Sequence, residues 1–228
     1  EVPTILDNHD IAMLENTRYA DVPKKRESGC DLTLAEFWAK AGEFFVNDAF
    51  GTSHRKHASN YGISTFLPSA YGLLFKKEVE GLKPIVTKEP KRPFIVIMGG
   101  AKVDDKIELI DSILKKCDYL LLGGGIANTF NKAKGFNIGS SLYSESQEEN
   151  VSTLIGKYSN KIILPIDANV LKGNEVLNKD INNIESDEII YDIGNETIEL
   201  YKKYIDMAKT IFINGTVGYY EDKRFANG

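Results

Sequence analysis

Two lysines follow a glycine pair in a segment whose residue types suit phosphate binding. Gly99 and Gly100 end an apolar run, and Lys102 and Lys106 come directly after them. Glycines let a ligand approach the backbone, and unpaired N–H groups at a helix start attract phosphate. On a helix, residues four apart share one face, so both ammonium groups are expected to point the same way. A tight turn with two solvated lysines is the plainer alternative, because the segment matches neither a P-loop nor a dinucleotide fingerprint.

Two further segments contain groups that could contact a nucleotide. The glycine run 123–125 separates a second apolar run from a helical stretch, which indicates either close approach by a ligand or close packing of helix on strand. Residues 214–221 follow another apolar run and contain the amide of Asn214 and the carboxylate of Glu221. These groups could bind hydroxyls and phosphates, although a hairpin turn with a solvent-facing Glu221 is the plainer alternative.

Cationic side chains gather near the N-terminal end of the chain. Residues 47–59 contain Arg55, one lysine and two histidines, and Arg18 closely follows the apolar run 11–14. Guanidinium groups bind phosphate or carboxylate through two parallel hydrogen bonds. A zinc site is disfavoured because the histidine pair has no adjacent Glu or Cys, and a serine nucleophile is disfavoured because no nucleophile elbow is present. For Arg18 a surface salt bridge is the plain alternative.

The composition limits the class of protein. With 42% hydrophobic and 27% charged residues among 228, the chain is typical of a globular protein rather than a disordered, collagenous or membrane one. A net charge of -5 argues against a nucleic-acid partner, so any bound anion must meet local positive charge. Two cysteines without CxxC spacing, and the lack of a signal peptide or a span-length apolar run in this sequence, predict a cytoplasmic protein without a membrane partner.

Apolar runs that end in glycine and lead into amphipathic stretches predict βαβ units. The predicted buried strands are 93–98, 118–122, 161–165 and 210–213. Helices are expected between them, at about 104–116 and 126–134, so the strands should form a parallel sheet that is covered on both faces. A second α/β region is expected upstream, with strands at 11–14 and 44–46 and a helix at about 34–41.

A helix at 72–85 and a charged, proline-bounded stretch at 87–93 form the best boundary candidate in the chain. We therefore expect one domain over residues 1–72, a connecting helix and hinge over 73–92, and a second domain over 93–228.

Five of these segments, taken together and in order, resemble phosphoglycerate kinase. The segments are LENTRY at 14–19, VNDAFGTSHRKHAS at 46–59, GGAKVDDKI at 99–107, GGGIANTFNKAKG at 123–135, and NGTVGYYE at 214–221 followed by FANG at 225–228. The resemblance covers essentially the whole chain, which corresponds to the middle of the family chain.

The resemblance implies two Rossmann-like, three-layer α/β/α domains with mainly parallel sheets, joined by a hinge helix, with both domains incomplete in this chain. The first domain of the family binds phosphoglycerate and the second binds Mg-nucleotide. The implied reaction is glycolytic: a phosphoryl group moves reversibly between 1,3-bisphosphoglycerate and ADP, giving 3-phosphoglycerate and ATP. A monomeric enzyme gated by hinge closure is expected.

The resemblance also implies roles for individual residues. Arg18 and Arg55 would contact the phosphoglycerate, and with Lys102, which would stabilise the transferring phosphoryl group, they form the expected catalytic set. Lys106 and Asn214 would approach the nucleotide phosphates, and Glu221 the ribose. The full nucleotide-binding set that the resemblance implies is Gly100, Ala101, Lys102, Lys106, Gly125, Asn214 and Glu221.

This sequence departs from the family pattern in three ways. It has no counterpart of the family's N-terminal strand with Asp and Asn, or of the C-terminal GGGD segment whose Asp reaches the magnesium ion. Mg²⁺ is therefore expected to arrive with the nucleotide, with no metal ligand in this chain, and the 228-residue chain alone is expected to be inactive. Thr216 and Ile213 stand where the family usually has Pro and Trp. A non-catalytic nucleotide-binding protein on the same scaffold is the competing hypothesis.

Overall fold

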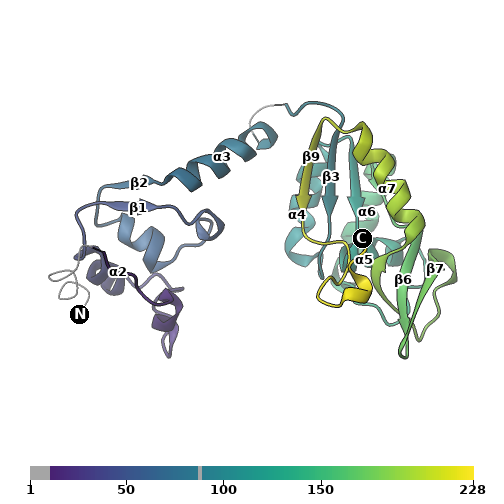
Figure 1. The fold of residues 1–228 in the computed structure, drawn as a ribbon, viewed down its shortest axis with the longest axis horizontal. Helices are drawn as coiled ribbons and strands as arrows, with labels where there is room; N and C mark the ends of the chain where they lie inside the picture. Colours follow the sequence, from purple (N-terminus) through teal and green to yellow (C-terminus); the bar gives the residue numbers. More distant parts are fainter. Residues whose placement is uncertain (1–10, 87–88) are drawn as a thin grey trace. The chain divides into compact units, whose positions relative to one another are not determined.

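The computed structural model describes residues 11–86 and 89–228, and the chain divides into two compact units, Glu1–Glu89 and Pro90–Gly228 (Figure 1). Residues 87–88 of the predicted hinge, and residues 1–10 of the first predicted domain, lie outside the described part.

The described residues of the first unit form two α-helices, short helical turns and a short parallel strand pair. Its elements are α2 (Leu32–Ala39), β1 (Phe45–Asn47), β2 (Ser69–Tyr71) and α3 (Leu73–Val86). Asp31 begins α2 by accepting the backbone N–H of Thr33 at 2.9 Å, the usual role of an N-cap carboxylate. The predicted strand at 11–14 is wrong, because these residues are irregular and Met13 is 97% exposed. An apolar run forms a strand only where a neighbour pairs with it.

The second unit is built on a parallel sheet, as the sequence predicted. In spatial order its strands are β5 (Ile162–Ile163), β4 (Tyr119–Leu122), β3 (Phe94–Met98) and β9 (Thr210–Asn214). Its helices are α4 (Ile107–Leu114), α5 (Gly124–Ala133), α6 (Glu148–Tyr158) and α7 (Asn195–Met207). The fold is thus of the α/β class with a mainly parallel sheet, which confirms the predicted fold class.

The two faces of this sheet carry alternate side chains. Ile95 and Leu121 pack against Tyr201 of α7, which lies along one face (Figure 1). Val96 and Leu120 point to the opposite face by the strand alternation and are also fully buried. The prediction that 210–213 is buried is wrong, because β9 pairs only with β3 in the described sheet and Ile213 is 63% exposed.

A second, antiparallel sheet was not predicted. It consists of β7 (Glu175–Asp180), β6 (Asp167–Lys172) and β8 (Ile189–Ile193) in spatial order. Its strands carry buried polar side chains, Asp167, Asn169 and Asp192 among them, which interrupt the apolar pattern that marks a core strand. Asp167 also stabilises the N-terminal end of α7, because its carboxylate accepts the backbone N–H of Thr197 at 2.7 Å.

A cluster of salt bridges lies next to this second sheet. Glu185 lies between Lys172 and Lys179, with N–O distances of 2.5 and 2.7 Å. Lys179 also pairs at 2.5 Å with the buried Glu188, the residue before β8. The hydrogen bonds from Lys172 and then from Lys179 lower the pKa of Glu185 to about 2.

We expect Glu185 to give this unit a measurable acid dependence. Because its pKa in the folded protein is depressed from 4.5 to about 2, its stabilising contribution is present above pH 4.5 and is lost as the pH falls towards 2. The difference in free energy of unfolding between wild type and Glu185→Gln should therefore shrink over that interval. Urea titrations at a series of pH values measure it.

Glu175→Gln, at an exposed position of β7 in the same sheet, is the matched control and should show a much weaker dependence. A wild type minus Glu185→Gln difference that stays constant down to pH 3 would contradict the assignment.

Candidate functional site

Three glycine turns meet at the carboxyl edge of the parallel sheet. Because β3, β4 and β9 run in the same direction, the turns that follow them lie at the same edge, where open α/β sheets bind ligands. The turns are bonded to one another as well: Gly99 N–H donates to the carbonyl of Asn214 at 3.0 Å, and Gly124 N–H donates to that of Val217 at 2.9 Å.

The turns pack backbone against backbone. A Cβ atom at Gly125 would lie 1.9 Å from the carbonyl oxygen of Ala101, and one at Gly99 would lie 1.9 Å from that of Thr216. The packing alternative for the run 123–125 therefore accounts for glycine at 125, and close packing also requires glycine at 99. It does not exclude the ligand alternative, because Gly125 also lines the cavity described next.

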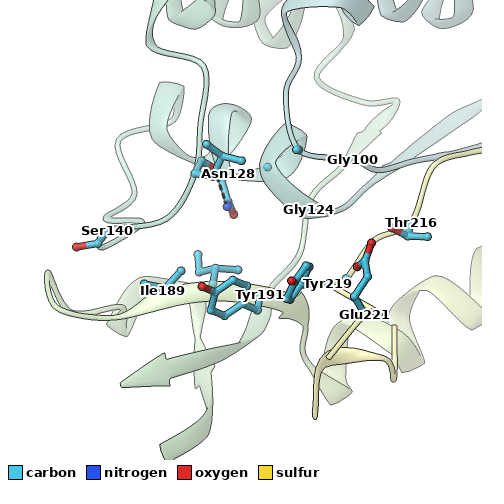
Figure 2. Close-up of a pocket in the computed structure, with 14 residues that line it drawn as sticks. Gly100, Gly124, Asn128, Ser140, Ile189, Tyr191, Thr216, Tyr219 and Glu221 are labelled. Carbon is cyan, nitrogen blue, oxygen red and sulfur yellow. Dashed lines mark hydrogen bonds between the residues drawn. The ribbon is translucent and has the colours of Figure 1, made fainter. Parts of the chain in front are cut away.

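A cavity of about 610 Å³ opens between these turns and β8, within the size range of small-molecule sites. Its lining residues are Gly100, Ala101, Gly124, Gly125, Asn128, Ser140, Leu142, Ile189, Ile190, Tyr191, Thr216, Gly218, Tyr219 and Glu221. Figure 2 shows Gly100, Gly124 and Asn128 on one side and Tyr191 and Tyr219 on the other, with Thr216 and Glu221 at one end. Gly100, Ala101, Gly125 and Glu221 of the predicted nucleotide set lie here together.

Two tyrosines form the wall opposite the glycine turns. The rings of Tyr191 and Tyr219 lie 5.6 Å apart between centroids, and Phe225 packs on Tyr191 at 4.9 Å. Tyr219 N–H donates to the Tyr191 carbonyl at 2.8 Å, which fixes the pair. Sequence reasoning missed Tyr191, because the strand that carries it was not predicted.

Lys106 and Asn214 meet beside the cavity. The Lys106 ammonium donates to the side-chain oxygen of Asn214 at 2.8 Å and to the Gly99 carbonyl at 3.0 Å. Both acceptors are neutral, so neither cancels the ammonium charge. The expectation that Lys102 and Lys106 share a helix face is wrong: α4 begins at Ile107, Lys106 ends a 3-10 turn, and Lys102 lies before that turn and is exposed.

The loop that carries Glu221 is fastened by a buried carboxylate that sequence reasoning missed. Asp192, at 1% exposure, accepts the backbone N–H groups of Asn227 at 3.1 Å and Gly228 at 3.0 Å. Burial raises the pKa of Asp192 above its usual range, while these amides act in the opposite direction. Asp192 thereby fixes both ends of the segment 217–228 relative to β8, since Gly218 also packs against its carboxylate.

The two predicted arginines lie in the first unit and make local contacts there. Arg18 is paired with Asp21 at 2.8 Å, which matches its plain alternative. Arg55 is exposed and lies 3.4 Å from a ring nitrogen of His54, while its carbonyl accepts a hydrogen bond from the buried Asn60 at 3.0 Å. Both side-chain contacts use the Nε atom of the guanidinium group, so its terminal nitrogens can still meet an anion.

Glu27 supports the Arg55 loop and was also missed. Its carboxylate is 1% exposed and accepts the Ser59 hydroxyl at 2.6 Å and the Ser59 N–H at 3.0 Å. His57 Nδ1 lies 3.4 Å away. A lone glutamate in a charged stretch gives no sequence signal of such burial.

Within residues 11–86 and 89–228, no group of three His, Cys, Asp or Glu side chains is arranged to hold a metal ion. In the same part of the chain, no helix combines the length and the apolar character needed to cross a membrane.

The cavity lies among glycine turns at the carboxyl edge of a parallel sheet, and the Lys106 ammonium beside it bonds neutral acceptors. This arrangement is typical of α/β proteins that bind phosphorylated ligands. The family model described as phosphoglycerate kinase matches residues 2–228. Proteins named phosphoglycerate kinase from Macrococcus caseolyticus and Enterococcus faecalis are 44% and 45% identical over 96% of this chain. A solved phosphoglycerate kinase from Coxiella burnetii is 35% identical, covers 88% of this chain and superposes with a TM-score of 0.75.

The chain belongs to the phosphoglycerate kinase family. It spans 56% of the length of the two relatives and 54% of the solved Coxiella chain.

Replacing Gly125 should damage the site through packing. In Gly125→Ala the new Cβ falls on the Ala101 carbonyl, so we expect a loss of roughly 1–3 kcal/mol in the free energy of unfolding. Urea denaturation measures it.

Gly156→Ala is the matched control, because a Cβ there, on α6, meets nothing within 4 Å. This variant should gain about 0.5–1 kcal/mol from helix propensity. Equal stability of the two variants would show that the turns do not pack as described.

Proposed function

We propose that this chain carries the nucleotide-binding site, and part of the phosphoglycerate-binding site, of a phosphoglycerate kinase. The proposed reaction is reversible phosphoryl transfer between 1,3-bisphosphoglycerate and ADP, giving 3-phosphoglycerate and ATP. The observation that carries the proposal is the cavity between the glycine turns and Tyr191, with the Lys106 and Asn214 pair beside it.

In this proposal the nucleoside enters the cavity between the glycine backbone and the tyrosine wall. Flat apolar faces and exposed backbone on opposite sides suit a planar base. Glu221, at one end of the cavity, would accept hydrogen bonds from the ribose hydroxyls (Figure 2). The phosphates would extend towards Lys106 and Asn214.

Phosphoryl transfer needs positioning and positive charge more than covalent help, because the charge of the transition state spreads over the equatorial oxygens. We assign Lys102 to that charge, and Arg18 and Arg55 to the phosphoglycerate. Mg²⁺ would neutralise nucleotide phosphates. We propose that it binds with the nucleotide. The monomeric state and the cytoplasmic location stay predictions.

Lys106→Met should weaken ADP binding by about tenfold or more, because a charge-assisted hydrogen bond to phosphate is lost. Adenosine has no phosphate, so its affinity should stay within about twofold of the wild-type value. Isothermal titration calorimetry of both ligands measures the difference.

Lys132→Met, at an exposed position on α5, is the matched control and should bind ADP as wild type does. An unchanged ADP affinity in Lys106→Met would remove Lys106 from the phosphate site. Failure of the wild-type chain to bind ADP would refute the proposed nucleotide site itself.

The expectation that the chain alone is inactive has its own assay. The 228-residue chain, ATP, Mg²⁺ and 3-phosphoglycerate should give no turnover above that of Lys102→Ala. Turnover that Lys102→Ala abolishes would contradict the expected inactivity, while supporting both the reaction and the role of Lys102.

A further inference from the structure

A chain of hydrogen bonds runs beneath the glycine turns and joins two of them. The Thr129 hydroxyl donates to the Gly125 carbonyl at 2.9 Å and accepts the Ser144 N–H at 3.1 Å. The Ser144 hydroxyl accepts the Val103 N–H at 3.3 Å and donates to the carboxylate of Asp104. The turn after β4 is thereby connected to the segment just after Lys102.

Most residues in this series of hydrogen bonds are buried from water. Val103 and Thr129 are 0% exposed and Ser144 is 5% exposed, so water does not readily replace a missing partner. Leaving a buried group without its hydrogen bond is costly, which makes each link specific. Asp104 completes the chain as an anion, since hydrogen bonds from Ser144 and then Ser146 lower its pKa.

The segment 138–146, which contains Ser144, is also hydrogen-bonded to other parts of the cavity wall. Asn128 donates its side-chain amide to the Leu142 carbonyl at 3.1 Å, and Ile190 N–H donates to the Ser141 hydroxyl at 2.8 Å. Leu142 and Ile190 both line the cavity. The segment 138–146 thus joins the wall that would contact the nucleoside to the turn that carries Lys102.

We infer that Ser144, held by Thr129 and bonded to Asp104, is a positioning residue that sets the Lys102 turn relative to the nucleotide cavity. This inference rests on the proposed function. Ser144 acts through the backbone of Val103, the residue next to Lys102, whose carbonyl also accepts the N–H of Lys106 at 2.9 Å. Its effect should therefore fall on the phosphates of a bound nucleotide and not on the nucleoside.

The test compares Ser144→Ala with wild type in two measurements. ADP affinity should fall about fivefold, in line with the loss of one hydrogen bond, while adenosine affinity stays within about twofold. Amide hydrogen exchange at Val103 should accelerate by about tenfold relative to the core amide of Leu121, because its acceptor is gone.

Two variants serve as controls. Ser146→Ala removes an exposed hydroxyl that bonds the other oxygen of Asp104 at 2.9 Å but does not touch Val103, so it should behave as wild type. Ser144→Thr keeps the hydroxyl and should restore most of the ADP affinity. A defect in overall structure would not be rescued in this way.

Equal losses of ADP and adenosine affinity in Ser144→Ala, or unchanged Val103 exchange, would overturn the inference. If Ser144→Ala does not fold, Asp104→Ala makes the same test through Val103 exchange, which should accelerate because the Ser144 hydroxyl loses its acceptor; an unchanged rate there also overturns the inference. If wild type does not bind ADP, the proposed function fails, and the exchange measurements still decide whether Ser144 holds the turn.

Discussion

The structure of the second unit depends on the backbone contact between glycine turns at the carboxyl edge of its parallel sheet. Gly125 and Ala101 approach so closely that no Cβ fits at Gly125, and Gly99 and Thr216 are packed in the same way. Because no flexible side chain separates them, the three turns cannot shift independently. The side of the cavity that these turns form is therefore shaped mostly by backbone, and its position is fixed.

The positions of the charged side chains suit an anionic ligand even though the chain has a net negative charge. If a chain with a net charge of -5 is to bind a polyanion, as proposed for this one, it must keep its carboxylates from opposing the ligand. Asp192 and Asp167 are buried and bonded to backbone amides, so they need no lysine as a partner. Lys106 in turn bonds neutral oxygens only in its observed contacts with Gly99 and Asn214, and its charge remains available to an anion.

Much of the fold could be predicted because its signals are local. The strands at β3 and β4 are apolar on both faces, and glycine marks the turn after each, so pattern and position agree. The predictions failed where contacts with distant parts of the chain determine whether a strand forms. The run 11–14 has apolar residues without a pairing strand in the described residues, and β6 and β8 contain buried polar groups whose partners lie far along the chain. The candidate site residues differ in the same way. Asn214 ends a predicted strand, and Lys106 and Glu221 come after predicted strands, whereas Tyr191 and Asp192 belong to the unpredicted sheet.

The glycine turns explain why supporting residues escape sequence analysis. A turn of small residues can contact a ligand closely, but it has few side chains with which to hold itself in place. The holding groups must then come from elsewhere, and here Thr129, Ser144 and Asp192 supply them through hydrogen bonds to backbone atoms. Such residues need only a correctly placed oxygen, which many residue types provide. A site of this kind therefore has a recognisable ligand-contacting sequence and a support that only the folded structure reveals.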